Sequence, residues 1–143
     1  MPSFSHSIAV PKPPAEVFPW LLEEDKVPRW TGDLASYQQL GPLSAGAKVR
    51  QVLSFSGSHV TLDVDVTRYE APQLAETRFS TNGVEITNLY TVEPDGASGS
   101  RVTQELDAKA TSLTARMVIP VVQGRLEKKL TDDLERLRGL LTA

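Results

Sequence analysis

The segment HVTLDVDVTRYEAP, residues 59–72, decides the fold class because apolar and polar residues alternate through its first half. The two sides of this alternation are Val60, Leu62, Val64 and Val66 against Thr61, Asp63, Asp65 and Thr67. Successive side chains of a strand point to opposite faces, so the pattern predicts a strand with one dry face and one solvated face. The dry face needs either a covering layer of protein or a bound molecule.

Further strands are expected around this segment, separated by turn residues. Their expected positions are residues 3–10, a short strand from residue 35, residues 48–55, both sides of the dipeptide at 82–83, and a last strand through residues 102–108. Asn82-Gly83 is a strong hairpin signal, and strands joined by short turns form an antiparallel sheet. After the first strand, the proline-rich PKPPAEVFPWLLEED predicts a short helix over about Pro14 to Leu22, interrupted or bent at Pro19. A second short helical turn or a loop carrying Trp30 is expected next.

The C-terminal region has the apolar period of one long helix. Its stripe consists of Ile119, Val122, Leu126, Leu130, Leu134, Leu137 and Leu141. The opposite face is expected to hold i,i+4 ion pairs between Lys128 and Asp132, Lys129 and Asp133, and Asp132 and Arg136. Pro120 is expected near the start of the regular helix, or as a kink in it. The only partner large enough for the stripe is the dry face of the sheet, so the sequence predicts an α+β fold.

Composition narrows the class of protein. The chain has 143 residues, a formal net charge of -3 and no cysteine. We therefore expect one domain over residues 1–143, no nucleic-acid partner, no disulfide and no thiolate metal site. The start MPSFSHSIAV lacks the pattern of a secretory signal, and no apolar run is long enough for a membrane span. The expectation is a soluble, cytoplasmic protein, and the sequence leaves a homodimer open.

Three segments carry a family resemblance: the opening HSIAVPKPPAEVFPWLLEEDKVPRW, the hairpin VEPDGASGSRVTQEL and the closing GRLEKKLTDDLERLRGLL. They resemble the START/Bet v 1-like (SRPBCC) superfamily, particularly its bacterial polyketide cyclase/dehydrase-like branch, and their order along the chain extends the similarity of pattern over essentially its whole length. Two departures from the family pattern are Pro19 inside the first helix and Ser100 where a Thr is common. Neither threatens the fold.

The resemblance implies a helix-grip fold, in which a curved antiparallel sheet of about seven strands wraps a long C-terminal helix. It also implies that an apolar or amphipathic small molecule, such as a lipid or polyketide, is held between sheet and helix. The superfamily shares no catalytic residues, and its members include carriers, cyclases or aromatases, and helpers of protein complexes. The resemblance therefore supplies an architecture and a general role.

Polar residues in phase with the inward apolar residues are the candidate ligand contacts. They are His6, Gln51, Thr77, Asn88, Tyr90 and Gln104. Leaving such a group buried without a partner costs about 1–3 kcal/mol, so each needs a neighbour, a water or a ligand. Any single one could pair with a neighbour or lie at a strand end. As a set they match the mixture of apolar and polar groups in ligand pockets, and so predict a partly polar cavity.

Three aromatic residues join this candidate site. Phe55 and Phe79 are expected on the inner face, where they would either wall the cavity or plug it. Trp30 lies beside the cavity mouth if the resemblance holds, and it could equally pin its loop to the core. The candidate binding residues are therefore the six polar positions together with Trp30, Phe55 and Phe79.

No motif points to a specific chemistry. His6 and Tyr90, helped by Asn88, are the groups that could transfer protons if the cavity were catalytic. His59 and the paired carboxylates Asp63 and Asp65 are expected in the solvated register. No metal-ligand spacing, glycine-rich phosphate loop or nucleophile elbow occurs, so no metal or cofactor is predicted.

Three functions stay open from the sequence. The first is a binding protein for a small hydrophobic or aromatic ligand. The second is a polyketide cyclase or aromatase that acts by confining its substrate, with acid–base help. The third is a protein-interaction module whose pocket is closed.

Overall fold

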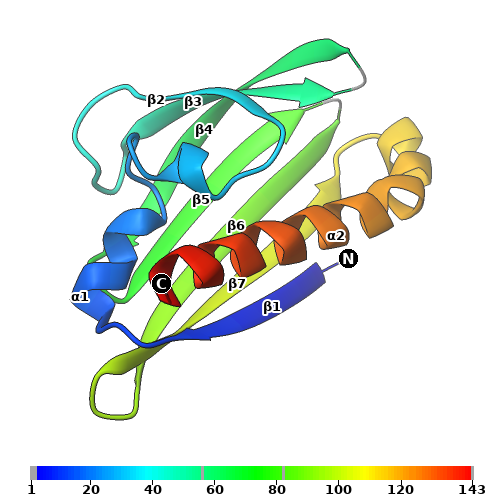
Figure 1. Cartoon of the computed structure of the whole chain (residues 1–143). Helices are drawn as coiled ribbons and strands as arrows, with labels where there is room; N and C mark the ends of the chain where they lie inside the picture. The colour runs from blue at the N-terminus through cyan, green and yellow to red at the C-terminus, as the bar shows by residue number, and fades with distance from the viewer. Residues whose placement is uncertain (1–2, 56, 82, 143) are drawn as a thin grey trace.

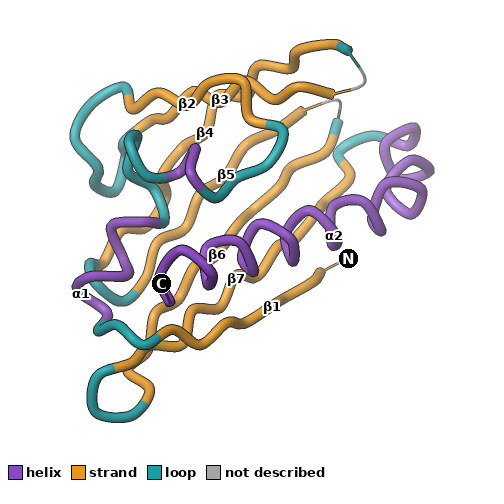
Figure 2. Tube along the Cα trace, in the orientation of Figure 1, coloured by secondary structure: helices purple, strands orange, loops and turns teal. Residues whose placement is uncertain are grey.

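The computed structural model describes residues 3–55, 57–81 and 83–142, except for the side chains of Phe55, Val121 and Val122. Its strands are β1 (Ser3–Val10), β2 (Leu34–Gln39), β3 (Lys48–Phe55), β4 (Ser58–Glu70), β5 (Leu74–Thr81), β6 (Val84–Asp95) and β7 (Gly99–Ala110). Its helical elements are α1 (Pro14–Val17), the 3₁₀ turns η1 (Phe18–Trp20) and η2 (Val27–Arg29), and α2 (Leu113–Thr142). The strands form one antiparallel sheet in the order β1-β7-β6-β5-β4-β3-β2. Figures 1 and 2 show this curved layer with α2 laid across it, which is the helix-grip fold expected from the sequence.

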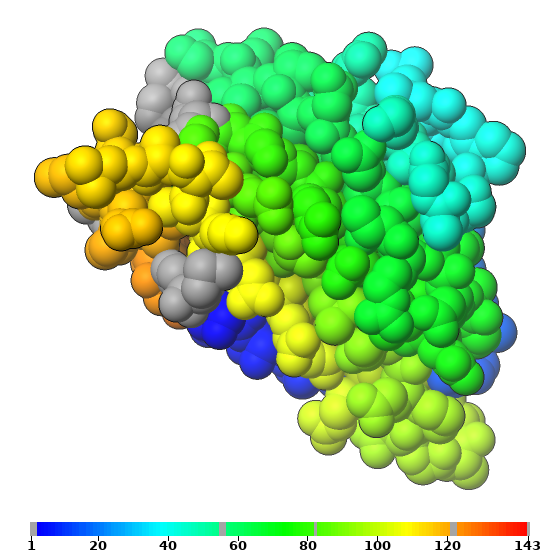
Figure 3. All heavy atoms as spheres, turned by 180° about the vertical axis from the view of Figure 1, so that it is seen from behind, coloured from blue at the N-terminus to red at the C-terminus, as the bar shows by residue number. Residues whose placement is uncertain are grey.

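The alternation in β4 is confirmed residue by residue. Leu62, Val64 and Val66 are buried on the inner face, whereas Asp63 and Asp65 are exposed. The two aspartates form ion pairs with arginine and lysine side chains of β3, at 3.0 Å and 2.6 Å. Figure 3 shows this outer face of the molecule, formed by the strands themselves. The solvated reading of the paired carboxylates is therefore confirmed.

Helix α2 buries its leucine stripe against the inner face of the sheet. Leu130, Leu134, Leu137 and Leu141 are all buried in the main core. The helix packs chiefly on β1 and β7, at one side of the sheet (Figure 1). The inner face of the other strands is therefore not covered by α2 alone, and α1, η1 and η2 close that side. This uneven cover leaves space between sheet and helix.

Helix α2 begins earlier than its apolar period suggests. It starts at Leu113, so Pro120 lies inside the helix rather than at its start. A proline in a helix removes one backbone hydrogen bond and bends the axis. Figure 1 shows the first turns of α2 turning away from the line of the remainder. Of the two expectations for Pro120, the interior kink is the one that the structure supports.

Two local features that the sequence predicted are an interruption of the first helix and a hairpin turn at Gly83. The first helix stops as α1 at Val17 and continues as the 3₁₀ turn η1 around Pro19, which confirms the interruption there. Gly83 has φ +78° in the β5–β6 turn, whereas Asn82 lies outside the described residues. The Gly83 carbonyl accepts hydrogen bonds from the backbone N–H and the hydroxyl of Thr111, at 2.7 Å and 2.8 Å. This hairpin therefore fixes the point from which α2 starts.

Candidate functional site

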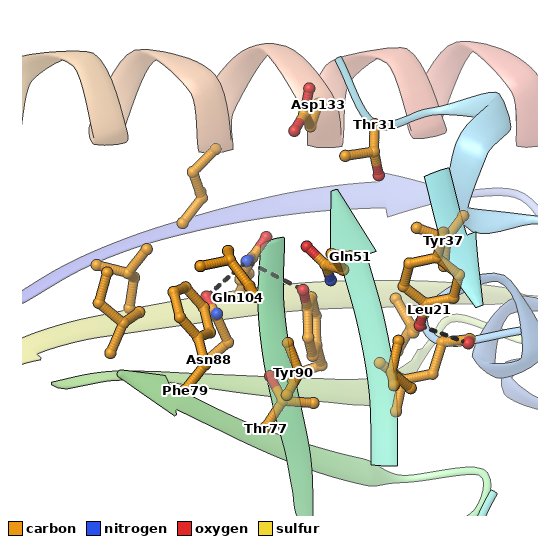
Figure 4. A pocket seen from close by; sticks show the side chains of 18 of the residues that line it. Leu21, Thr31, Tyr37, Gln51, Thr77, Phe79, Asn88, Tyr90, Gln104 and Asp133 are labelled. Atoms are coloured by element: carbon orange, nitrogen blue, oxygen red, sulfur yellow. Dashed lines mark hydrogen bonds between the residues drawn. The ribbon is translucent and has the colours of Figure 1, made fainter. Parts of the chain in front are cut away.

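A cavity of about 160 Å³ lies between the inner face of the sheet and α2. Strands β3 to β7, the loop after η2 and the middle of α2 all contribute side chains to its wall (Figure 4). Most of the wall is aliphatic or aromatic. The polar lining residues are Thr31, Tyr37, Gln51, Thr77, Asn88, Tyr90, Gln104, Lys129 and Asp133. This is the partly polar hollow that the sequence predicted.

A hydrogen-bonded trio forms the polar centre of the cavity. The Nε2 amide of Gln104 donates to Oδ1 of Asn88 at 3.0 Å and to the phenol oxygen of Tyr90 at 3.2 Å. Strand register explains this arrangement, because Tyr90 on β6 lies directly opposite Gln104 on β7. Asn88 is two residues before Tyr90 and therefore points to the same face. All three side chains are more than nine-tenths buried.

Several polar atoms in the cavity wall have no hydrogen-bond partner in the described part of the chain. They are the amide of Gln51, the hydroxyl of Thr77, the amide oxygen of Gln104, the amide nitrogen of Asn88 and the hydroxyl proton of Tyr90. Within the described residues, no fully enclosed polar side-chain atom lacks a partner. These unpaired groups therefore open onto the cavity space (Figure 4) and can bond to its contents.

Two tyrosines face the cavity in the neutral form. Burial, and to a lesser degree the Asp133 carboxylate, raises the pKa of Tyr90. Burial also raises the pKa of Tyr37, with smaller contributions from Tyr90 and Glu24. The Tyr37 hydroxyl donates to the carbonyl of Leu22 at 2.7 Å. Both phenols therefore stay protonated at ordinary pH, and Tyr90 is suited to donate a hydrogen bond rather than to act as a base.

An ionic cluster lies at the cavity wall, and the sequence predicted only its Lys129–Asp133 pair. Asp133 is 7% exposed, and its carboxylate accepts hydrogen bonds from Lys129 at 2.6 Å and from the backbone N–H of Gly32 at 2.9 Å. Arg136 approaches the same carboxylate at 3.3 Å and donates to the carbonyl of Trp30 at 2.8 Å. Lys129 also donates to the Gly32 carbonyl at 2.9 Å. We call Asp133, Lys129 and Arg136 the α2 clasp, because they tie the loop after η2 to the long helix.

The clasp corrects two expectations about helix charges. The Lys128–Asp132 pair is confirmed at 2.6 Å on the exposed face, but Asp133 lies on the buried side of α2 rather than opposite the apolar stripe. Arg136 pairs with Asp133 and not with Asp132. The physical reason is that the backbone of the loop after η2 offers an N–H donor and two carbonyl acceptors to this helix face. No i,i+4 pattern contains that tertiary partner.

The predicted aromatic residues take different positions. Trp30 lines the cavity and is also anchored, because its indole Nε1 donates to the carbonyl of Trp20 at 2.8 Å. Trp30 therefore contributes to the cavity wall and also pins its loop. Phe79 lines the cavity as a half-buried wall residue. The side chain of Phe55 lies outside the described residues.

His6 is the expected site residue that the structure places elsewhere. It is on the helix-facing side of β1 as predicted, but it is not among the described residues that line the cavity. Its Nε2 lies 2.9 Å from a carboxylate oxygen of Glu135 on α2, at a side chain that is 26% exposed. His6 therefore does not form part of the wall of this cavity. The reason is that β1 lies at the sheet edge beneath α2, where the helix itself fills the space.

The described residues contain neither a cluster of metal-ligating side chains nor a membrane-spanning helix. No three histidine or acidic side chains there come together as metal ligands. Among the described helices, none combines the length and apolar character needed to cross a membrane. The remaining predicted residues, Gln51, Thr77, Asn88, Tyr90 and Gln104, all line the cavity.

A comparison with models of protein families identifies the family of this chain. The model of the family described as polyketide cyclase / dehydrase and lipid transport matches residues 1–142. The chain belongs to this family. A sequence comparison with curated proteins finds no match. The family membership confirms the resemblance to the START-like superfamily that the sequence motifs indicated.

Solved structures with the same fold are distant in sequence. TTHA0849 from Thermus thermophilus is 16% identical with a TM-score of 0.78, covering 96% of this chain and 95% of that one. A START superfamily protein from Mycobacterium smegmatis is 14% identical with a TM-score of 0.75, covering 98% and 99%. The two-domain aromatase/cyclase BexL is 18% identical with a TM-score of 0.73, covering 97% of this chain and 46% of that one. At these identities the likeness concerns the fold alone.

Proposed function

We propose that this protein of the polyketide cyclase/dehydrase and lipid transport family binds a small, largely apolar or aromatic molecule in the cavity between the sheet and α2. The observation that carries this proposal is the cavity of about 160 Å³, whose apolar wall includes buried polar groups with unused hydrogen-bonding capacity. Ligand sites combine these features, because apolar walls supply affinity and a few polar groups fix orientation. Water or a ligand must satisfy such groups.

The cavity supports binding better than acid–base catalysis. Its titratable lining residues in the described chain are Tyr37, Tyr90, Lys129 and Asp133. Burial keeps both phenols protonated, and the lysine and the carboxylate are bonded to each other at 2.6 Å. A general base must have a free acceptor near the proton it removes. A cyclase role would therefore rest on confinement of the substrate, and turnover of poly-β-ketones by the purified protein would favour it.

Thermal unfolding with a library of aromatic and lipid-like compounds tests the binding proposal. A ligand present at 100 times its Kd stabilises the folded state by about 2.7 kcal/mol, which raises the Tm of a domain of this size by roughly 5–10 °C. Leu106→Phe adds ring volume to the cavity wall, so we expect it to reduce the ligand-induced shift. Thr61→Phe, on the exposed face of β4, is the matched control and should leave the shift unchanged. No shift with any compound, or equal shifts in both variants, would refute binding in this cavity.

A further inference from the structure

We infer that the cavity selects an uncharged, single-ring molecule whose polar group both donates and accepts hydrogen bonds, as a carboxamide or lactam does. This inference rests on the proposed binding function and specifies the class of ligand. Three features of the site carry this inference. They are the cavity volume, the free donors and acceptors of the hydrogen-bonded Asn88, Tyr90 and Gln104 (called here the amide trio), and the pairing of the charged wall residues with each other.

The volume limits the ligand to about one ring. An apolar protein cavity of about 150 Å³ is known to hold benzene, and this cavity measures about 160 Å³. Pockets for larger organic ligands span about 300–1,000 Å³. A fused-ring system or an acyl chain would have to displace wall residues such as Phe79 or Leu126. A single substituted ring needs no such displacement.

The amide trio presents one acceptor beside two donors. Gln104 uses both protons of its Nε2 amide on Asn88 and Tyr90, so its oxygen is left as an acceptor. Asn88 accepts through its oxygen, so its amide protons are left as donors. Tyr90 accepts from Gln104 through its oxygen, so its O–H is left to donate. Gln51, whose side chain has no partner in the described chain, adds a third amide near these groups (Figure 4).

A carboxamide or lactam complements this arrangement with a single planar group. Its N–H can donate to the Gln104 oxygen while its carbonyl accepts from Asn88 or Tyr90. A carboxylate has only acceptors and would place its charge against the Gln104 oxygen. An ammonium group has only donors and would leave the Asn88 and Tyr90 protons unsatisfied. Leaving polar groups unsatisfied in a binding site is what gives such a site strong discrimination.

The charged residues in the wall do not call for a charged ligand. Asp133 is bonded to Lys129, Arg136 and the Gly32 N–H, and the Lys129 ammonium also donates to the Gly32 carbonyl. Of the three clasp residues, only Asp133 and Lys129 line the cavity, and their opposite charges are paired with each other. A net charge brought into the cavity would lose its hydration without gaining an opposite partner, which is costly. The site therefore favours a neutral polar group.

Calorimetric titration at neutral pH with five probes tests the inference. The probes are benzamide, toluene, benzoate, benzylamine and 2-naphthamide. We expect benzamide to bind about tenfold more tightly than toluene, the factor typical of one net hydrogen bond. Benzoate and benzylamine should bind more weakly than toluene, and the fused rings of 2-naphthamide should weaken its binding relative to benzamide.

A pair of variants assigns the preference to the amide trio. Gln104→Leu removes one acceptor and should reduce the advantage of benzamide over toluene while keeping toluene binding; the Asn88 amide, released from Gln104, retains part of the preference. Gln38→Leu makes the same change on the exposed face of β2 and should preserve the advantage. If Gln104→Leu fails to fold by circular dichroism, Asn88→Leu replaces it. Toluene binding without a benzamide preference, or a preference that is undiminished in the trio variant, overturns the ligand class and leaves the binding function intact. Absence of binding by every probe and by the wider library overturns both.

Discussion

Removing the Asp133 carboxylate should destabilise the protein far more than removing its neighbour Asp132. Both aspartates contact a lysine four residues earlier at 2.6 Å, but Asp133 is 10% exposed at its side chain and Asp132 is 50% exposed. Truncating one partner of a fully buried ion pair costs about 3–5 kcal/mol. Here the cationic partners Lys129 and Arg136 are 31% and 48% exposed and can recover hydration, which lowers the cost. We expect a cost of about 2 kcal/mol for Asp133→Ala, below that range.

Urea denaturation measures this difference, with Asp132→Ala as the matched control. The control removes an exposed i,i+4 pair, so its cost should stay below about 0.5 kcal/mol. Amide hydrogen exchange at Gly32 supplies a local readout, because its N–H loses its acceptor only in the Asp133 variant. Equal costs for the two variants, or an unchanged exchange rate at Gly32, would show that the α2 clasp does not hold the loop.

Three further predictions concern the frame around the cavity. Gly83→Ala should lower the free energy of unfolding by at least about 1 kcal/mol, because φ is +78° and the added Cβ would lie 2.7 Å from a serine oxygen. Gly124→Ala adds its methyl group in open space on α2 and should raise the free energy of unfolding by about 0.5–1 kcal/mol. Urea denaturation measures both changes. Ser100→Ala should cost about 1 kcal/mol in the same assay, because its fully buried hydroxyl donates to a backbone carbonyl at 2.6 Å. Glu135→Gln tests pH dependence: the His6 hydrogen bond, and then the neighbouring arginine, lowers the pKa of this carboxyl. The ionised Glu135 carboxylate therefore contributes its whole stabilisation above its ordinary pKa of 4.5 and loses it as the pH falls through its lowered pKa in the folded protein. The difference in Tm between wild type and Glu135→Gln should therefore disappear in acid.

Local patterns were sufficient to predict the sheet and the polar trio. The alternation in β4 depends only on residues within one strand, and each strand face is then determined by phase. Asn88, Tyr90 and Gln104 were identified because they interrupt apolar faces at even spacing, and all three line the cavity. That reasoning holds wherever the register has no slip between neighbouring residues, as in β6 and β7.

Tertiary pairing explains what the sequence did not predict. Asp133 resembles an ordinary solvated helix residue, yet its backbone partner Gly32 lies 101 positions away in the chain. The start of α2 was missed because Leu113 and Met117 are exposed, so the apolar stripe does not extend to the helix terminus. His6 lies on the inner face of the sheet, as the alternation in β1 predicted, but beneath α2 and not in the cavity wall. Alternation along a strand identifies the face of the sheet and does not show which part of that face a helix covers.

The most direct test of the binding site is an amide NMR titration of the isotope-labelled protein with toluene. A molecule inside the hollow between the strands and the long helix should shift the resonances of Asn88, Tyr90 and Gln104 and leave those of Thr61 and Asp63, on the outer face, unchanged. Shifts confined to the outer face, or none at saturating toluene, would contradict a ligand site at this place.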